Sequence, residues 1–318
     1  MSKVKTGTIT LKPDPSVDDK PDKKFAEKWK AIIWSVVFIV ATITLTFIWF
    51  YTPAFRSYVE NLGPTFYYFL AAGFVFAMID GAIGMSYGVT STTFSVSVMG
   101  IPPASASTAV HLSEILSNAI AGWMHYRMRN VNMRLFWHLV IAGSIGAVLG
   151  AYLLSSLEHY SAYTKPLVSI YTLILGGVIL FKAIRLGRKD KQKRAKRLKN
   201  VRPLGFFGGF IDAVGGGGWG SIVLSSLIAG GRNPRTSLGT VKMSRFFIAM
   251  LSSLTFVTML NTIHWEAIGG LIIGSAVASP IATKVSSKIS VKTIMLAVSV
   301  IVILASLKSI FTFISKVI

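Results

Sequence analysis

The chain has 318 residues, of which 52% are hydrophobic and only 14% are charged, and its mean hydropathy is +0.60. This balance is typical of a polytopic membrane protein rather than a soluble domain, and the absence of cysteine excludes disulfides, thiolate metal sites and thiol catalysis. The net charge of +21 does not indicate a nucleic-acid partner, because lysines and arginines flank hydrophobic runs and concentrate in residues 182–202. We interpret them as topology signals and as contacts with anionic lipids at residues 182–202.

The first part of the chain is predicted to contribute an arm and one helix. Residues 1–30 are polar and rich in lysine, aspartate and proline, which predicts a disordered cytoplasmic arm. The apolar run Ile32–Phe50 predicts an extra transmembrane helix over residues 31–51, because no cleavage site for a signal peptidase follows it. Further apolar runs long enough to cross a bilayer are Leu135–Leu154, Val168–Ile184, Trp265–Thr283 and Ile294–Phe313.

An internal duplication organises the remainder of the chain. Residues 73–88 read GFVFAMIDGAIGMSYG, and residues 205–220 read GFFGGFIDAVGGGGWG, at an offset of 132. From Pro103 and Pro234 onward the two copies match at an offset of 131. We therefore predict two transmembrane repeats, at 64–184 and 204–316, joined by a basic cytoplasmic linker at 185–203. Helices interrupted at matching places of two repeats are a sequence pointer to a transporter's binding site.

The distribution of charge predicts that the repeats enter the membrane from opposite faces. Lysines before Ile32 place the N-terminus in the cytoplasm, residues 51–65 suit the outside, and the basic linker suits the inside. The first repeat therefore begins outside and the second inside, which is an inverted topology. We expect each repeat to contain a glycine-broken or re-entrant hairpin, followed by a full helix that begins near Pro103 or Pro234. The fold class is accordingly an all-α polytopic membrane protein.

Asp80 and Asp212 occupy equivalent apolar surroundings beside the two glycine clusters. Intramembrane acids are rare, so proton or sodium coupling or gating is one interpretation, and capping of the glycine-rich bend is the other. Free backbone N–H groups at a helix start can bind an anion, although glycine also permits close helix packing. Tyr87 and Trp219 border the glycines as pocket walls, gates or packing residues.

The helices after the prolines carry further charged residues. His111 and Glu114 share one helical face with Ser107 and Asn118 in the first repeat, and at offset 131 they match Lys242 and Arg245 in the second. We hypothesise that Glu114 and Arg245 face each other across the repeat interface, as a buried ion pair or as an anion site. The residues expected to bind the substrate are Arg245, Lys242, His111, Ser113, Ser244, Gly84, Gly88, Gly216, Gly220, Trp219 and Tyr87. Those expected to serve coupling or gating are Asp80, Asp212 and Glu114. His138 is interpreted as a satisfied core residue.

Three stretches resemble the TauE/SafE family of sulfite and organosulfonate exporters. They are the paired IDGAIGMSYG and IDAVGGGGWG, the PPASASTAVHLSEILSNAIAG segment and the NPRTSLGTVKMSRFF segment, and the resemblance covers about residues 64–316. It implies a permease for small anions such as sulfite, thiosulfate or sulfonates, driven by an ion rather than by ATP. Export is the direction that the resemblance implies.

The functional prediction is a secondary transporter with alternating access, located in the cell membrane with several crossings. Its expected partners are a small anionic substrate, a coupling proton or sodium ion, and a second copy in a homodimer. No catalytic signature, metal motif or nucleotide loop is present in the sequence, so no cofactor, metal or enzymatic activity is expected. A non-transporting membrane scaffold is the alternative, and an intramembrane aspartyl enzyme that uses Asp80 and Asp212 is a further one.

Overall fold

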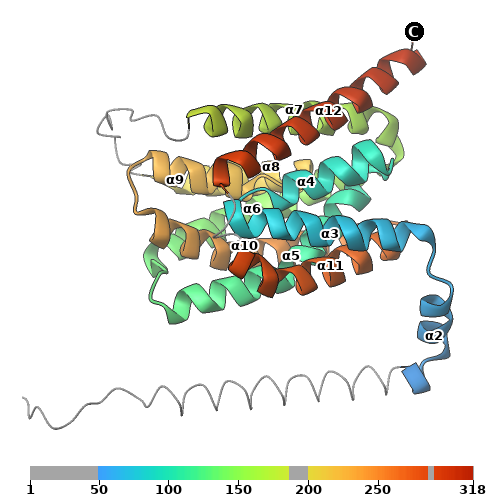
Figure 1. The fold of residues 1–318 in the computed structure, drawn as a ribbon, viewed down its shortest axis with the longest axis horizontal. Coiled ribbons are helices and arrows are strands. Elements are labelled where there is room, and N and C mark those ends of the chain that lie inside the picture. The colour runs from blue at the N-terminus through green and yellow to red at the C-terminus, as the bar shows by residue number, and fades with distance from the viewer. Residues whose placement is uncertain (1–48, 186–199, 286–289, 318) are drawn as a thin grey trace, which may run out of the picture. The chain divides into compact units, whose positions relative to one another are not determined.

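The computed structural model describes residues 49–185, 200–285 and 290–317, and the secondary structure in these ranges is entirely helical (Figure 1). Residues 1–62 and 63–318 form two separate units. The first unit contributes α2, Pro53–Glu60. The predicted arm over residues 1–30 lies outside the described residues, as do the helix expected over 31–51, except at its C-terminal end, and most of the linker.

The first repeat begins with a helix that is broken at the first glycine cluster. Helix α3 ends where Gly84 adopts a left-handed conformation with φ of 76°, which glycine reaches without steric cost. The chain resumes at Tyr87 as a short helix that continues into a π-helical turn at Phe94–Val98. The helices of this repeat are α3 (Pro64–Ile83), α4 (Tyr87–Thr93), α5 (Pro103–Arg127), α6 (Met133–Ser156) and α7 (Ser161–Arg185).

The second repeat contains corresponding elements, but its π-helical turn comes before the short helix rather than after it. Gly216 ends α8 with φ of 67°, and a π-helical turn at Gly220–Leu224 again follows the break. Its helices are α8 (Arg202–Gly215), α9 (Ser225–Ala229), α10 (Pro234–Met259), α11 (Trp265–Val285) and α12 (Val291–Val317). The full helices α5 and α10 begin at Pro103 and Pro234, as the sequence predicts, because proline needs no backbone donor in a first turn.

Contacts between the repeats join equivalent helices. Helix α5 packs on α10 and α7 packs on α12, while α3 packs on α11 just as α8 packs on α6. Glycines allow the close approaches, since a Cβ at Gly274 would lie 2.7 Å from the backbone nitrogen of Phe74. The broken helix of each repeat is thus held against a full helix of the other.

The unit formed by residues 63–318 has an apolar exterior, and its interior combines hydrophobic clusters with buried polar and charged side chains. Five helical stretches in the described residues are long and apolar enough to cross a membrane, namely 64–81, 133–156, 158–185, 234–259 and 292–315. Helix α5 has 25 residues and is less apolar, because it carries polar side chains, including His111 and Glu114, that are buried. Polar groups that face the bundle interior are the arrangement of a polytopic membrane protein, which confirms the predicted all-α class.

Candidate functional site

The two helix breaks meet in the interior of the bundle. A Cβ placed on Gly217 would lie 2.7 Å from the Cα of Gly88, so neither break tolerates a side chain at its closest point. Two hydroxyls of the first repeat hold the second break: Thr92 donates to the carbonyl of Gly216 at 2.5 Å, and Tyr171 donates to that of Gly217 at 2.5 Å. The irregular backbone of each break is therefore surrounded by protein, as it must be at membrane depth.

Each aspartate caps the helix that resumes after its break. Asp80 Oδ1 accepts from the backbone nitrogens of Ser86 at 2.8 Å and Tyr87 at 3.1 Å, and Asp212 Oδ1 accepts from that of Trp219 at 2.7 Å. Tyr87 and Trp219 are equivalent at offset 132, so the same bond recurs in both repeats. The capping interpretation of the two acids is correct, and their remaining oxygens are available for other partners.

The second oxygens make ion pairs that cross between the repeats. Asp80 Oδ2 lies 3.1 Å from Lys242 Nζ, and Asp212 Oδ2 lies 3.3 Å from His111 Nε2. Since Lys242 and His111 are equivalent at offset 131, the two pairs correspond: each hairpin acid binds the base on the full helix of the other repeat. The other ring nitrogen of His111 lies 2.8 Å from the carbonyl of Ser107, and the ring donates to both acceptors only when each nitrogen carries a proton.

Arg245 lies between the two pairs and links three helices. Its Nε donates to Glu114 Oε2 at 2.7 Å, a second nitrogen donates to the same oxygen, and Nη1 donates to Asp212 Oδ1 at 2.9 Å. The structure thus contains the contact between Glu114 and Arg245 that the sequence suggested. Three carboxylates face Lys242, Arg245 and the His111 imidazole in this cluster, so the positive charges are matched when the imidazole is protonated.

A small cavity adjoins this cluster. Its volume is 20 Å³, which holds about one water molecule. The predicted site residues that line it are Asp80, Gly84, Tyr87, Gly88, Glu114, Gly220, Lys242 and Arg245. An anion the size of sulfite does not fit this volume in the present conformation.

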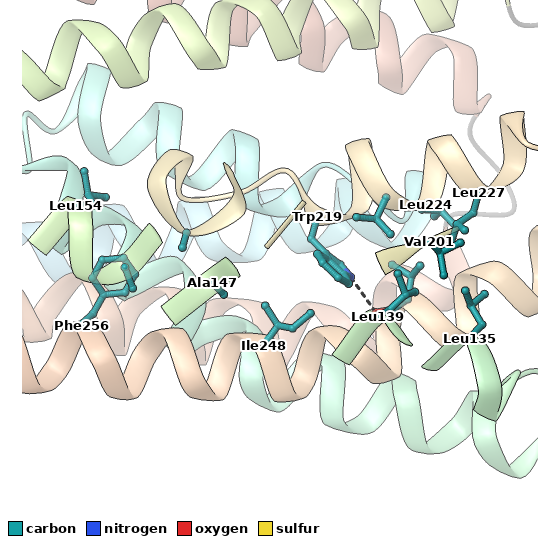
Figure 2. Packing of buried hydrophobic residues seen from close by; sticks show 14 of the residues in the cluster. Leu135, Leu139, Ala147, Leu154, Val201, Trp219, Leu224, Leu227, Ile248 and Phe256 are labelled. Atoms are coloured by element: carbon teal, nitrogen blue, oxygen red, sulfur yellow. Dashed lines mark hydrogen bonds between the residues drawn. The ribbon is translucent and has the colours of Figure 1, made fainter. Parts of the chain in front are cut away.

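The other predicted site residues lie behind the cavity wall. Trp219 is fully buried and donates its indole N–H to the carbonyl of Val241, in an apolar cluster with Leu139 and Val223 (Figure 2). Ser113 and Ser244 donate to carbonyls of their own helices at equivalent positions.

His111 and Asp212 line no part of the cavity, and Gly216 serves as the left-handed end of α8. These residues support the cavity rather than facing it.

Sequence reasoning missed several residues around the breaks. Met85 and Val241 line the cavity, and Thr92 and Tyr171 fasten the second break. Gly218 also lines the cavity, but it belongs to the second glycine cluster that the sequence predicts. Neither Thr92 nor Tyr171 lies in a local motif that predicts a bond to the distant second break. No local pattern predicts the crossed ion pairs, because each joins an aspartate of one repeat to a base that is distant in sequence.

One family model and two curated proteins match the chain. The profile described as Sulfite exporter TauE/SafE matches residues 69–309. The chain is 39% identical over 215 residues to a Bacillus subtilis protein named probable membrane transporter protein YtnM, covering 66% of this chain and 71% of that one. It is 28% identical over 210 residues to a probable membrane transporter protein of Haemophilus influenzae, covering 64% and 79%. No solved structure matches the chain.

Proposed function

The chain belongs to the sulfite exporter TauE/SafE family and is a membrane transporter rather than an enzyme, and we propose that it exports small sulfur-containing anions such as sulfite, thiosulfate or sulfonates. The observation that carries this proposal is the buried guanidinium of Arg245 beside the meeting point of two broken helices. Its planar fork of donors matches the oxygens of a sulfur oxyanion. The family name supports the substrate class, and the cavity beside Arg245 supports the position of the site.

We infer that anion binding is coupled to a proton. Arg245 already binds Glu114 and Asp212, so an incoming anion competes with two carboxylates for the same donors. Protonation of Glu114 would remove one competitor and release part of the guanidinium. Proton binding and anion binding then favour each other by linkage, and net export follows when the outward gradient of the anion exceeds the inward gradient of protons.

The unequal exposure of the crossed pairs supports alternating access. The Asp80 and Lys242 side chains are 17% and 21% exposed, whereas those of Asp212 and His111 are 1% and 0% exposed. Lys242 lies eight residues after Pro234, and His111 lies eight residues after Pro103, so each is about 12 Å along its helix. In the predicted inverted topology, the more exposed pair is nearer the cytoplasm. We propose that the opposite conformation exposes Asp212 and His111 and buries Asp80 and Lys242.

Anion binding to purified protein tests this proposal. Protein in detergent is heated with sulfite, thiosulfate, sulfoacetate, taurine, sulfate or acetate, because a ligand of the folded state raises the Tm. We expect a rise with a sulfur oxyanion in the wild type and its loss in Arg245→Gln. Glu114→Gln mimics the protonated acid, and we expect it to bind the same anion about tenfold more tightly, as for one charged competitor removed.

A control separates binding from general charge. Arg235→Gln removes an exposed arginine on the same helix, and its response to each anion should equal that of the wild type. Should Arg245→Gln fail to fold, the sign of the Glu114→Gln effect still decides. If no sulfur oxyanion raises the Tm of either the wild type or Glu114→Gln, the proposed substrate class is contradicted.

A further inference from the structure

A second cavity lies apart from the central cluster, where α6 and α8 begin. Its volume is 590 Å³, which is within the range of small-molecule sites. Three arginines line it: Arg134 from α6, Arg202 from α8, and Arg232 from the segment before α10. The first belongs to one repeat and the other two belong to the second, so the cavity lies at a junction of the repeats.

The lining of this cavity is basic. No carboxylate is among its described lining residues, and His138 adds an imidazole that is partly exposed. The interpretation of His138 as a core residue is therefore wrong, because the side chain borders an open cavity one turn after Arg134. The first turns of α6 and α8 contain no acidic residue, so the positive ends of both helix dipoles add to the arginines.

The cavity lies at the end of a membrane-spanning helix. Arg134 is the second residue of the apolar helix Met133–Ser156, which places its guanidinium at the depth of lipid headgroups. The cavity is also lined by Leu135 and Val201, which are 5% exposed and belong to the apolar cluster of Figure 2. The acyl chains of a lipid need a more exposed apolar surface beside the arginines.

The outer face of α6 extends an apolar surface from the same helix end. Trp137, Ile141 and Ile145 are 56%, 59% and 53% exposed, and their spacing of four residues puts them on one stripe. Acyl chains of a lipid held at the start of α6 would lie along such a stripe. The basic cavity and the apolar stripe together have the amphipathic character of a phospholipid.

We propose that this cavity binds the phosphate of an anionic phospholipid, with Arg134, Arg202 and Arg232 as its ligands. The site is a formed cavity between elements of both repeats, and is distinct from the general attraction of the basic linker for the membrane surface. A bound lipid would tie the start of α6 to the start of α8 and to the segment before α10. It therefore stabilises the junction of the repeats on that side.

Lipid binding to delipidated protein tests the proposal without any assay of transport. Protein in detergent is titrated with phosphatidylglycerol, and the bound lipid is counted by native mass spectrometry. We expect the wild type to hold one phosphatidylglycerol that Arg134→Gln weakens about tenfold, as for one charged hydrogen bond lost, and that Arg134→Gln/Arg202→Gln weakens further. Both arginines are exposed, so the variants should elute as folded protein from a sizing column.

A matched control variant and two contrary outcomes complete the test. Arg235→Gln removes an exposed arginine that does not line the cavity, and it should bind phosphatidylglycerol as the wild type does. Equal lipid binding by the double variant and the wild type would overturn the proposal. Binding of inorganic phosphate as tight as that of phosphatidylglycerol would overturn it too, because the cavity would then be a site for a soluble anion.

Discussion

Arg245 concentrates the interactions of the central site in one side chain. It binds carboxylates from α5 and α8 while it projects from α10, and its own side chain is 7% exposed. Buried charges are costly unless they are paired, so Arg245 stabilises the fold mainly as the counter-ion of two buried acids. Removing it leaves both acids without their shared counter-ion.

We therefore predict that Arg245→Ala strongly destabilises the protein. The expected loss is about 3–5 kcal/mol of unfolding free energy, because the change leaves Glu114 buried without a counter-ion and leaves Asp212 with His111 alone. Denaturant or thermal unfolding in detergent measures it. Arg235→Ala, an exposed site on the same helix, should stay within about 0.5 kcal/mol of the wild type. Similar losses in both variants would contradict the network described here.

At this scale, sequence reasoning predicted a contact but not the network around it. Glu114 and Arg245 are equivalent at offset 131, and equivalent positions near a pseudo-two-fold axis approach each other. Asp80 and Lys242 are not equivalent to each other, and only the packing of a hairpin on the opposite full helix brings them together. That packing depends on helix crossings that no local pattern encodes.

The helix breaks are the elements that define the site. Gly84 and Gly216 end their helices with nearly the same φ, 76° and 67°, but their surroundings differ. A Cβ at Gly84 would find Leu238 Cδ1 at 3.5 Å, which is ordinary contact, whereas one at Gly216 would overlap the Thr92 side chain. Both carry the cost of a left-handed residue, and only the second also carries a steric conflict.

Alanine at these two glycines is therefore expected to have unequal effects. Gly84→Ala should cost about 1 kcal/mol, the strain of a left-handed alanine alone. Gly216→Ala should cost about 1–3 kcal/mol more, since Thr92 must move and give up its bond to the Gly216 carbonyl. Parallel thermal unfolding of the two variants measures the difference. Equal Tm values would show that Thr92 is free to move and would contradict this account.

The sequence predicted the breaks and the two full helices because glycine and proline act locally. It did not predict the π-helical turns at Phe94–Val98 and Gly220–Leu224, which follow both breaks. No residue type marks such a turn, and its extra residue per turn is set by the packing of the resumed helix. The extra N-terminal helix is untested and stays a prediction.

The pairing of contacts across the molecule supports the inverted topology at the scale of the whole bundle. Helix α3 begins at one end in Figure 1, and α8 begins at the other, beside the end of α7. The pairs of Asp80 with Lys242 and of Asp212 with His111 also correspond, because each joins an aspartate of one repeat to a base of the other. Composition alone could predict neither the helix directions nor the crossed pairs, because it indicates which segments enter the membrane but not which of them pack together.

The absence of cysteine offers a direct test of that topology. Single cysteines at Met128, between α5 and α6, and at Asn261, between α10 and α11, occupy exposed loops after equivalent full helices. An inverted pair of repeats must place these loops on opposite faces, with Met128→Cys inside and Asn261→Cys outside. A membrane-impermeant maleimide applied to intact cells should therefore label only Asn261→Cys, and both should react after the membrane is opened. Labelling of both cysteines in intact cells would mean that the two helices run in the same direction. That result would also contradict the alternating-access proposal, in which the two crossed pairs exchange exposure.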